Sequence, residues 1–157
     1  MEKSKHIRIT DIEGYVLPSQ PPIPVIVCNL ENGKTFILYS VPYEIVIALS
    51  TITHEGEKIK NPTGRSSIFD LLSLLSSELE NTIGRRIRKI VIDYLDPDLM
   101  VYGASVYIDV EGAVIVKKMI PSHALFLAQL FNVPMYVSED LVFIQESMLR
   151  DEESEEF

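Results

Sequence analysis

The stretch MIPSHALFLAQLFNVPMYVSEDLV, residues 119–142, decides the fold because its pattern changes three times along its length. It begins with the end of an apolar run, turns at Pro-Ser-His, continues with helical spacing, and returns through Asn-Val-Pro to a second short apolar run. Proline is favoured in the first turn of a helix, since the amide that it lacks would have no partner there. We therefore predict a strand that ends near Ile120, a helix over residues 121–131 and a short strand over residues 135–137.

The apolar residues of this predicted helix form one stripe that we expect to face a sheet: Ala124, Leu125, Leu127, Ala128 and Phe131. Burying a leucine or phenylalanine side chain is worth about 1.5–3 kcal/mol, which is enough to explain the segment without catalysis. We then expect His123, in the first helical turn, to cap that turn and to take no part in chemistry. The alternative is that its imidazole acts as an acid or base near neutral pH.

Three consecutive strands are predicted before this stretch, at residues 86–95, 99–110 and 111–120, with tight turns at Asp96-Pro97-Asp98 and Glu111-Gly112. They follow a predicted helix, SSIFDLLSLLSSELENTIG (residues 66–84), whose apolar residues recur at helical spacing. We expect that helix to pack on the sheet through Ile68, Leu71, Leu72, Leu75 and Leu79.

The N-terminal part adds a strand at residues 7–17 and a hairpin whose strands, at residues 25–30 and 35–40, flank Asn32-Gly33. One helix begins at Pro42, and a last helix begins at Ser138 and runs to about residue 149. This order of elements predicts one α+β domain, residues 1–149, with a mostly antiparallel sheet and helices packed on it. The acidic residues 150–157 are expected to form a disordered tail.

The composition sets limits on the class of protein. The 157 residues are 46% hydrophobic, which is enough for one core without disulfides or metal. The formal net charge is −9, and five acidic residues lie in the C-terminal DEESEEF, so the charge of the rest neither supports nor excludes a nucleic-acid partner. Cys28 is the single cysteine; it excludes an intrachain disulfide and is predicted to be a small buried apolar residue.

Hydropathy gives expectations about location and assembly. The sequence has no apolar run of the about 20 residues that a membrane helix needs, and no signal-peptide core. We therefore expect no membrane contact and a cytoplasmic location. Several predicted strands are more apolar than a half-exposed sheet requires, which favours a homo-oligomer, most simply a dimer.

Four blocks in residues 25–142 resemble, in their order, the bifunctional nuclease family. A hairpin leads into a helix with an early glutamate, FILYSVPYEIVIAL with Glu44, and a second helix begins after an arginine, RSSIFDLL with Arg65 and Asp70. The hairpin RIRKIVIDYLDPDLMVYGASVYI and the stretch at residues 119–142 complete the pattern. Ile120 and His123 stand where the family usually has an arginine and an aspartate.

The resemblance implies a nuclease that hydrolyses DNA or RNA without strong sequence preference. Glu44 and Asp70 would be its catalytic carboxylates and would hold a divalent metal such as Mg²⁺. Nucleic acid would be contacted by basic residues, and Ser122 and His123 would form a polar site at the start of the helix at residues 121–131. The basic residues are Arg85, Arg86, Arg88, Lys117 and Lys118.

A second interpretation needs no catalysis. Acidic residues in the first turn of a helix are favoured by the helix dipole alone, and basic residues on an edge strand discourage edge pairing. The chain would then be a non-catalytic oligomeric binding or interaction module on the same scaffold. One observation separates the two hypotheses: Glu44, Asp70 and a basic side chain gathered in one concave pocket favour the enzyme, whereas their dispersal favours the module.

Overall fold

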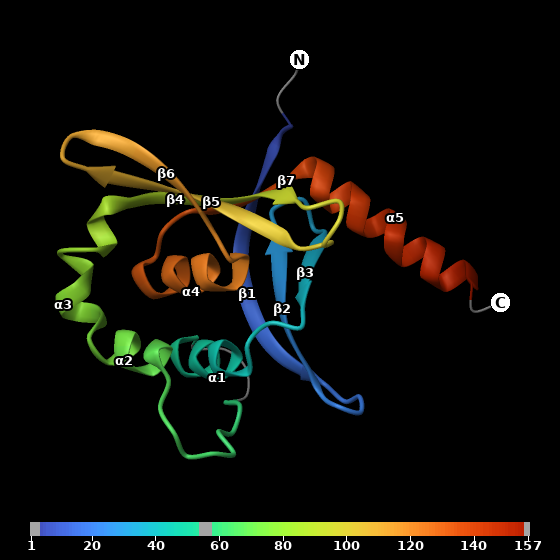
Figure 1. The fold of residues 1–157 in the computed structure, drawn as a ribbon, viewed down its shortest axis with the longest axis horizontal. Helices are drawn as coiled ribbons and strands as arrows, with labels where there is room; N and C mark the ends of the chain where they lie inside the picture. The colour runs from blue at the N-terminus through green and yellow to red at the C-terminus, as the bar shows by residue number, and fades with distance from the viewer. Residues whose placement is uncertain (1–3, 54–57, 156–157) are drawn as a thin grey trace.

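One seven-stranded sheet organises the chain, in the order β3-β2-β1-β7-β4-β5-β6 (Figure 1). The structure, a computed structural model, describes residues 4–53 and 58–155. Neighbouring strands are antiparallel except for β4 and β7, which are parallel. The prediction of an α+β domain with a mostly antiparallel sheet is confirmed. The strands are β1 (His6–Leu17), β2 (Ile23–Leu30), β3 (Thr35–Tyr39), β4 (Ile87–Leu95), β5 (Tyr102–Val110), β6 (Ala113–Met119) and β7 (Met135–Ser138).

The helices occupy the connections between strands and the C-terminal part. They are α1 (Tyr43–Ile52), α2 (Ile68–Leu74), α3 (Ser76–Glu80), α4 (Pro121–Phe131) and α5 (Glu139–Glu155), with a single 3₁₀ turn η1 (Gly84–Arg86) before β4. The predicted stretch is confirmed: β6 ends at Met119, α4 has proline in its first turn, and the backbone of Asn132 adopts a left-handed conformation, φ 55°, that ends the helix.

The short strand β7 joins the two halves of the sheet. It pairs with β1 on one side and with β4 on the other, so it links the β1–β2–β3 meander to the β4–β5–β6 meander. Its inward residues Met135 and Val137 are buried, as are Ile9 and Ile90, which pair with Met135 on either side. Four residues of strand at the centre of the sheet therefore give the domain a single core.

The sheet curls until its ends approach each other. The rings of Phe36 in β3 and Tyr102 in β5 meet edge to face with centroids 5.1 Å apart, although four other strands separate β3 from β5 in the sheet order. Helices α1 and α4 pack together inside this curve (Figure 1). Helix α5 lies along the outer edge of β3, where the Gln145 side chain bonds both the amide and the carbonyl of Ile37 at 2.8 Å.

The predicted helix at residues 66–84 is wrong in its continuity and in the face that it buries. It is two short helices that meet at Leu75, and three residues of the predicted face are exposed: Ile68, Leu71 and Leu75, at 65%, 52% and 39%. Leu72 and Leu79 of the same face do pack against the core. The helix does not lie flat on the sheet; it packs against α1, and its Phe69 ring contacts Phe126 of α4. The apolar spacing correctly predicted a helix, but the buried face is set by the packing against α1 and α4.

The predicted stripe on α4 needs one correction. Ala124, Leu125, Ala128 and Phe131 are buried as expected, but Leu127 is only partly buried, whereas Phe126 is fully buried. Phe126 is covered because α2 lies on a second side of α4, with the Phe69 and Phe126 ring centroids 5.2 Å apart. A helix that has neighbours on two sides buries a wider face than one apolar stripe.

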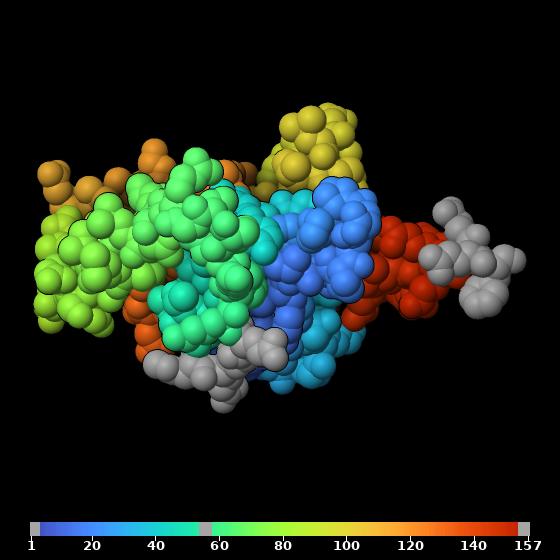
Figure 2. Space-filling view, turned by 90° about the horizontal axis from the view of Figure 1, so that it is seen from below, coloured from blue at the N-terminus to red at the C-terminus, as the bar shows by residue number. Residues whose placement is uncertain are grey.

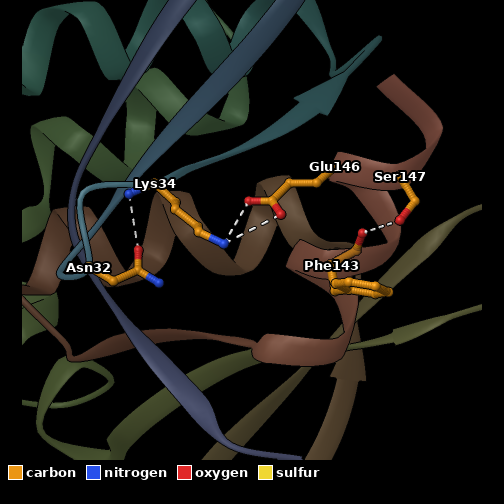
Figure 3. Close-up of polar contacts among 5 residues, drawn as sticks. All are labelled: Asn32, Lys34, Phe143, Glu146 and Ser147. Carbon is orange, nitrogen blue, oxygen red and sulfur yellow. Dashed lines mark hydrogen bonds and ion pairs between the residues drawn. The ribbon is translucent and has the colours of Figure 1, made fainter. Parts of the chain in front are cut away.

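The prediction of a disordered tail beginning at residue 150 is wrong for residues 150–155, because α5 continues to Glu155. Glutamate and arginine are good helix formers, so charge alone does not end a helix. The helix is also tied to the hairpin turn: Lys34 Nζ lies 3.0 Å from a Glu146 carboxylate oxygen, and Asn32 accepts from the Lys34 amide (Figure 3). Residues 156 and 157 of the predicted tail lie outside the described residues.

Candidate functional site: the cleft between α1 and α2

A cleft of about 570 Å³ lies where α1 and α2 begin. Tyr43, Glu44 and Ile47 of α1 form one wall, and Asp70 of α2 belongs to the other. The loop before α2 completes it with Asn61, Pro62, Thr63, Arg65, Ser66 and Ser67. Figure 2 shows this loop and α2, in green, beside α1, in teal. The cleft brings together both predicted carboxylates and one basic side chain.

Glu44 presents an unengaged carboxylate to this cleft. It lies in the first turn of α1, after Pro42, which has no side-chain group to cap the helix. Its side chain is exposed and makes no hydrogen bond within the described residues. The position suits the helix dipole, and no side-chain group of the described residues occupies the carboxylate.

Asp70 is held by a capping box at the start of α2. Its Oδ2 accepts a hydrogen bond from the Ser67 amide at 2.8 Å, and the Asp70 amide donates to Ser67 Oγ at 3.4 Å. This reciprocal pair fixes the carboxylate on a half-buried wall. The other oxygen, Oδ1, has no partner within the described residues, so Asp70 has both a structural role and a free acceptor.

Arg65 is the basic residue of the cleft. It belongs to one of the blocks that resemble the family, but it was not predicted as a site residue. Its loop is tightly bonded: Asn61 Nδ2 donates to the Arg65 carbonyl at 2.8 Å, and Thr63 Oγ1 accepts from the Arg65 amide at 3.2 Å. Gly64, at φ 67°, supplies a left-handed conformation that other residues rarely adopt. The Asn-Pro-Thr-Gly turn directly before Arg65 was the signal for this rigid loop.

The five other predicted basic residues do not line the cleft. Arg85 and Arg86 lie in the 3₁₀ turn η1, and β4 begins at Ile87, one residue later than the predicted strand. Arg88 is in β4, but its Nε is bonded to Asp109 at 2.7 Å, which raises its pKa. Lys117 and Lys118 are on β6, and β5 separates β6 from β4. These lysines are therefore not on a strand next to that of Arg88.

Ser122 and His123 lie at the start of α4 and do not line the α1–α2 cleft. Ser122 is 3% exposed and lines a different cleft. The His123 ring stands edge to face against Phe69, with centroids 5.3 Å apart, and the side chain makes no capping hydrogen bond. The expectation that His123 caps the helix is therefore wrong; it is a packing contact with α2.

The residues of the cleft fit a weakly coordinated divalent cation. Among the described residues, no three His, Cys, Asp or Glu side chains are grouped as metal ligands, which argues against a zinc site there. Mg²⁺ keeps several waters and commonly uses only one or two carboxylates together with substrate phosphates. Asp70 Oδ1 is the oxygen that would hold it, which leaves the Glu44 carboxylate available as a base.

Comparison with known proteins gives no match to any family model and none to a curated protein. In the described part of the chain, no helix combines the length and the hydropathy that crossing a membrane requires.

Proposed function

We propose that the chain is a metal-dependent nuclease that hydrolyses phosphodiester bonds of DNA or RNA in the α1–α2 cleft. The observation that carries this proposal is the convergence of Glu44, Asp70 and Arg65 on one concave surface. These residues come from two helix starts and the loop between them.

Each side chain has a distinct task in this proposal. The Arg65 guanidinium matches the geometry of a phosphate and binds it through paired hydrogen bonds. Asp70 is oriented by Ser67, so its free oxygen stays in place through the reaction. The exposed Glu44 carboxylate takes a proton from the attacking water. A divalent cation, when bound, supplies neutralisation of the phosphate charge and activation of that water.

The test is a nuclease assay on the purified protein with single-stranded DNA, duplex DNA and RNA, with Mg²⁺ or with EDTA. We expect cleavage that requires the metal. Glu44→Gln and Arg65→Ala should each lower the rate by about 100-fold or more, which is the usual scale for a general base or a charge-stabilising group. Asp70→Asn should lower the rate and raise the Mg²⁺ concentration needed for half activity.

Glu78→Gln is the matched control, because Glu78 is also an exposed acid in the first turn of a helix but does not line the cleft. It should leave the rate unchanged. Absence of metal-dependent cleavage on all three substrates, or equal effects of Glu44→Gln and Glu78→Gln, would reject the nuclease.

The second candidate is a non-catalytic homo-oligomeric module, and strand β6 is the observation that favours it. Residues 113–118 are all exposed, with Val114 and Val116 at 48% and 49% on one face of the sheet and Ile115 at 38% on the other. Within the described residues nothing pairs with the second edge of β6, whereas Gln145 covers the edge of β3. An apolar open edge is a site for pairing with another chain.

Charge indicates that the partner is a second copy. The β5–β6 turn carries Glu111, and β6 ends with Lys117 and Lys118. Antiparallel pairing of two β6 strands about a two-fold axis places the acidic end of each strand beside the basic end of the other. The proposal therefore includes a dimer formed by pairing of two β6 strands. It also places the protein in the cytoplasm, because a single buried cysteine suits a reducing compartment.

Light scattering at micromolar concentration should give the mass of a dimer. Val116→Lys should give a folded monomer, because it places two like charges in the paired edge. Leu74→Lys is the control: Leu74 is even more exposed, at 78%, but lies on α2, and the dimer should persist. A monomeric wild type, or a Val116→Lys variant that stays dimeric, would reject this interface without affecting the nuclease.

A further inference from the structure

A second cleft, of about 540 Å³, opens on a different part of the molecule and shares no lining residue with the α1–α2 cleft. It lies between the end of β3, the β4–β5 connection, the start of α4 and the outer half of α5. Its volume is in the range of small-molecule sites. Most of its wall is apolar: Leu38, Val41, Leu95, Val101, Ile120 and Leu149 are among the lining residues.

The start of α4 supplies unused hydrogen-bond donors to this cleft. The amide of Ser122, which lines the cleft, precedes the first intrahelical bond, from the Ala124 amide to the Ile120 carbonyl, and no side chain of the described residues caps it. The Ser122 side chain is 97% buried, since its exposed fraction is 3%, and it lines the cleft. Its hydroxyl has no hydrogen-bond partner within the described residues.

Tyr102 provides another donor at the same place. Ala104 of β5 pairs with Met119 of β6. Continued by two residues, this antiparallel register leads to Tyr102 on β5 and to Pro121, the first residue of α4. Its hydroxyl is buried and has no hydrogen bond of normal geometry within the described residues. Burial raises the pKa of Tyr102, and the neighbouring Gln145 amide offsets part of the rise, so at neutral pH the phenol is protonated and can donate.

These observations restrict the ligand to one chemical class. Helix N-termini with free amides favour an anionic oxygen, and the two hydroxyls add donors beside it. The apolar walls then require a hydrocarbon body. Glu152 is the only charged residue among those that line the cleft, and it lies on α5. Glu152 would repel a second negative charge on the ligand.

We propose that this cleft binds an apolar monocarboxylate. The carboxylate accepts from the amide and the hydroxyl of Ser122 and from the Tyr102 hydroxyl, and the hydrocarbon body lies along Leu95, Val101 and Leu149. The Ser122 and Tyr102 hydroxyls, unpartnered in the described structure, both gain an acceptor in the complex.

Calorimetric titration of the full chain with decanoate, below its micelle concentration, tests the proposal. We expect saturable binding at one site. Decanol, which keeps the chain but lacks the carboxylate, and butyrate, which keeps the carboxylate but lacks the chain, should each bind at least tenfold more weakly. Binding of decanol as tightly as decanoate would overturn the assignment of the headgroup.

Variants locate the site. Tyr102→Phe and Ser122→Ala should each weaken decanoate binding by about tenfold, the loss expected for one hydrogen bond to a charged group. Tyr102→Phe removes a buried hydroxyl that lacks a partner, so its unliganded melting temperature should be no lower than that of the wild type. Tyr107→Phe is the matched control, because Tyr107 lies elsewhere on β5 and does not line this cleft. Absence of saturable binding, or binding that Tyr102→Phe and Ser122→Ala leave unchanged, would overturn the proposal.

Discussion

Gln145 is predicted to hold α5 on the edge of β3. Its amide is 5% exposed and makes two hydrogen bonds with one residue: Oε1 accepts from the Ile37 amide, and Nε2 donates to the Ile37 carbonyl, both at 2.8 Å. Gln145→Ala removes both. At about 0.5–1.5 kcal/mol for each net hydrogen bond, the free energy of unfolding should fall by about 1–3 kcal/mol.

The assay is urea unfolding combined with hydrogen exchange. Urea unfolding gives the loss of free energy, and exchange should show faster opening at the Ile37 amide than at amides in β7. Gln129→Ala is the control, because Gln129 is also on a helix and only partly buried, and it should change stability by less than about 0.5 kcal/mol.

The reasoning would be refuted by unchanged protection of the Ile37 amide in Gln145→Ala. It would also be refuted if Gln129→Ala destabilised the protein as much. The first result would mean that α5 does not depend on this contact to cover the edge of β3, and that the remaining apolar contacts of Leu141 and Val142 are sufficient.

Three further predictions follow from the packing of individual side chains. Phe126→Ala should lower the free energy of unfolding by about 3–5 kcal/mol, and Leu127→Ala by clearly less, because Phe126 is fully buried and Leu127 is not; equal losses measured in urea would contradict the two-sided packing of α4. His123→Ala should leave any metal-dependent cleavage within a factor of about three of wild type, because the imidazole contacts Phe69 and does not line the α1–α2 cleft; abolished cleavage by a folded variant would show the contrary. Burial raises the pKa of Cys28 to about 12, so a thiol reagent at pH 8 should label it only as fast as the chain unfolds; rapid labelling of the native protein would show that the thiol is accessible.

Local signals in the sequence were sufficient for the segments in which one turn determines the outcome. Pro121 begins α4, Asn132 ends it, and the Asn32-Gly33 turn sets the β2–β3 hairpin. Each signal acts through the backbone conformation of one or two residues, so no distant partner is needed. The same logic failed at residue 150, because acidic residues do not end a helix by themselves.

Glu44 and Asp70 were candidates because the family resemblance implied them, but the sequence did not show that they share a cleft or that Arg65 joins them. That depends on the packing of α1 against α2, which lie on opposite sides of a loop. The second cleft shows the same limit, since its walls come from β3, β5, α4 and α5.

The sequence by itself determined the types of the elements, the turns that begin and end them, and the α+β class. Only the tertiary structure decided which side of each helix is covered, as the exposed Leu71 and the buried Phe126 show. The physical reason is that helical periodicity fixes the angles between side chains around the axis, whereas the buried side depends on which neighbour removes water from it. The helix at residues 68–74 has apolar residues on more than one side, and α1 and α4 select Phe69 and Leu72 from among them.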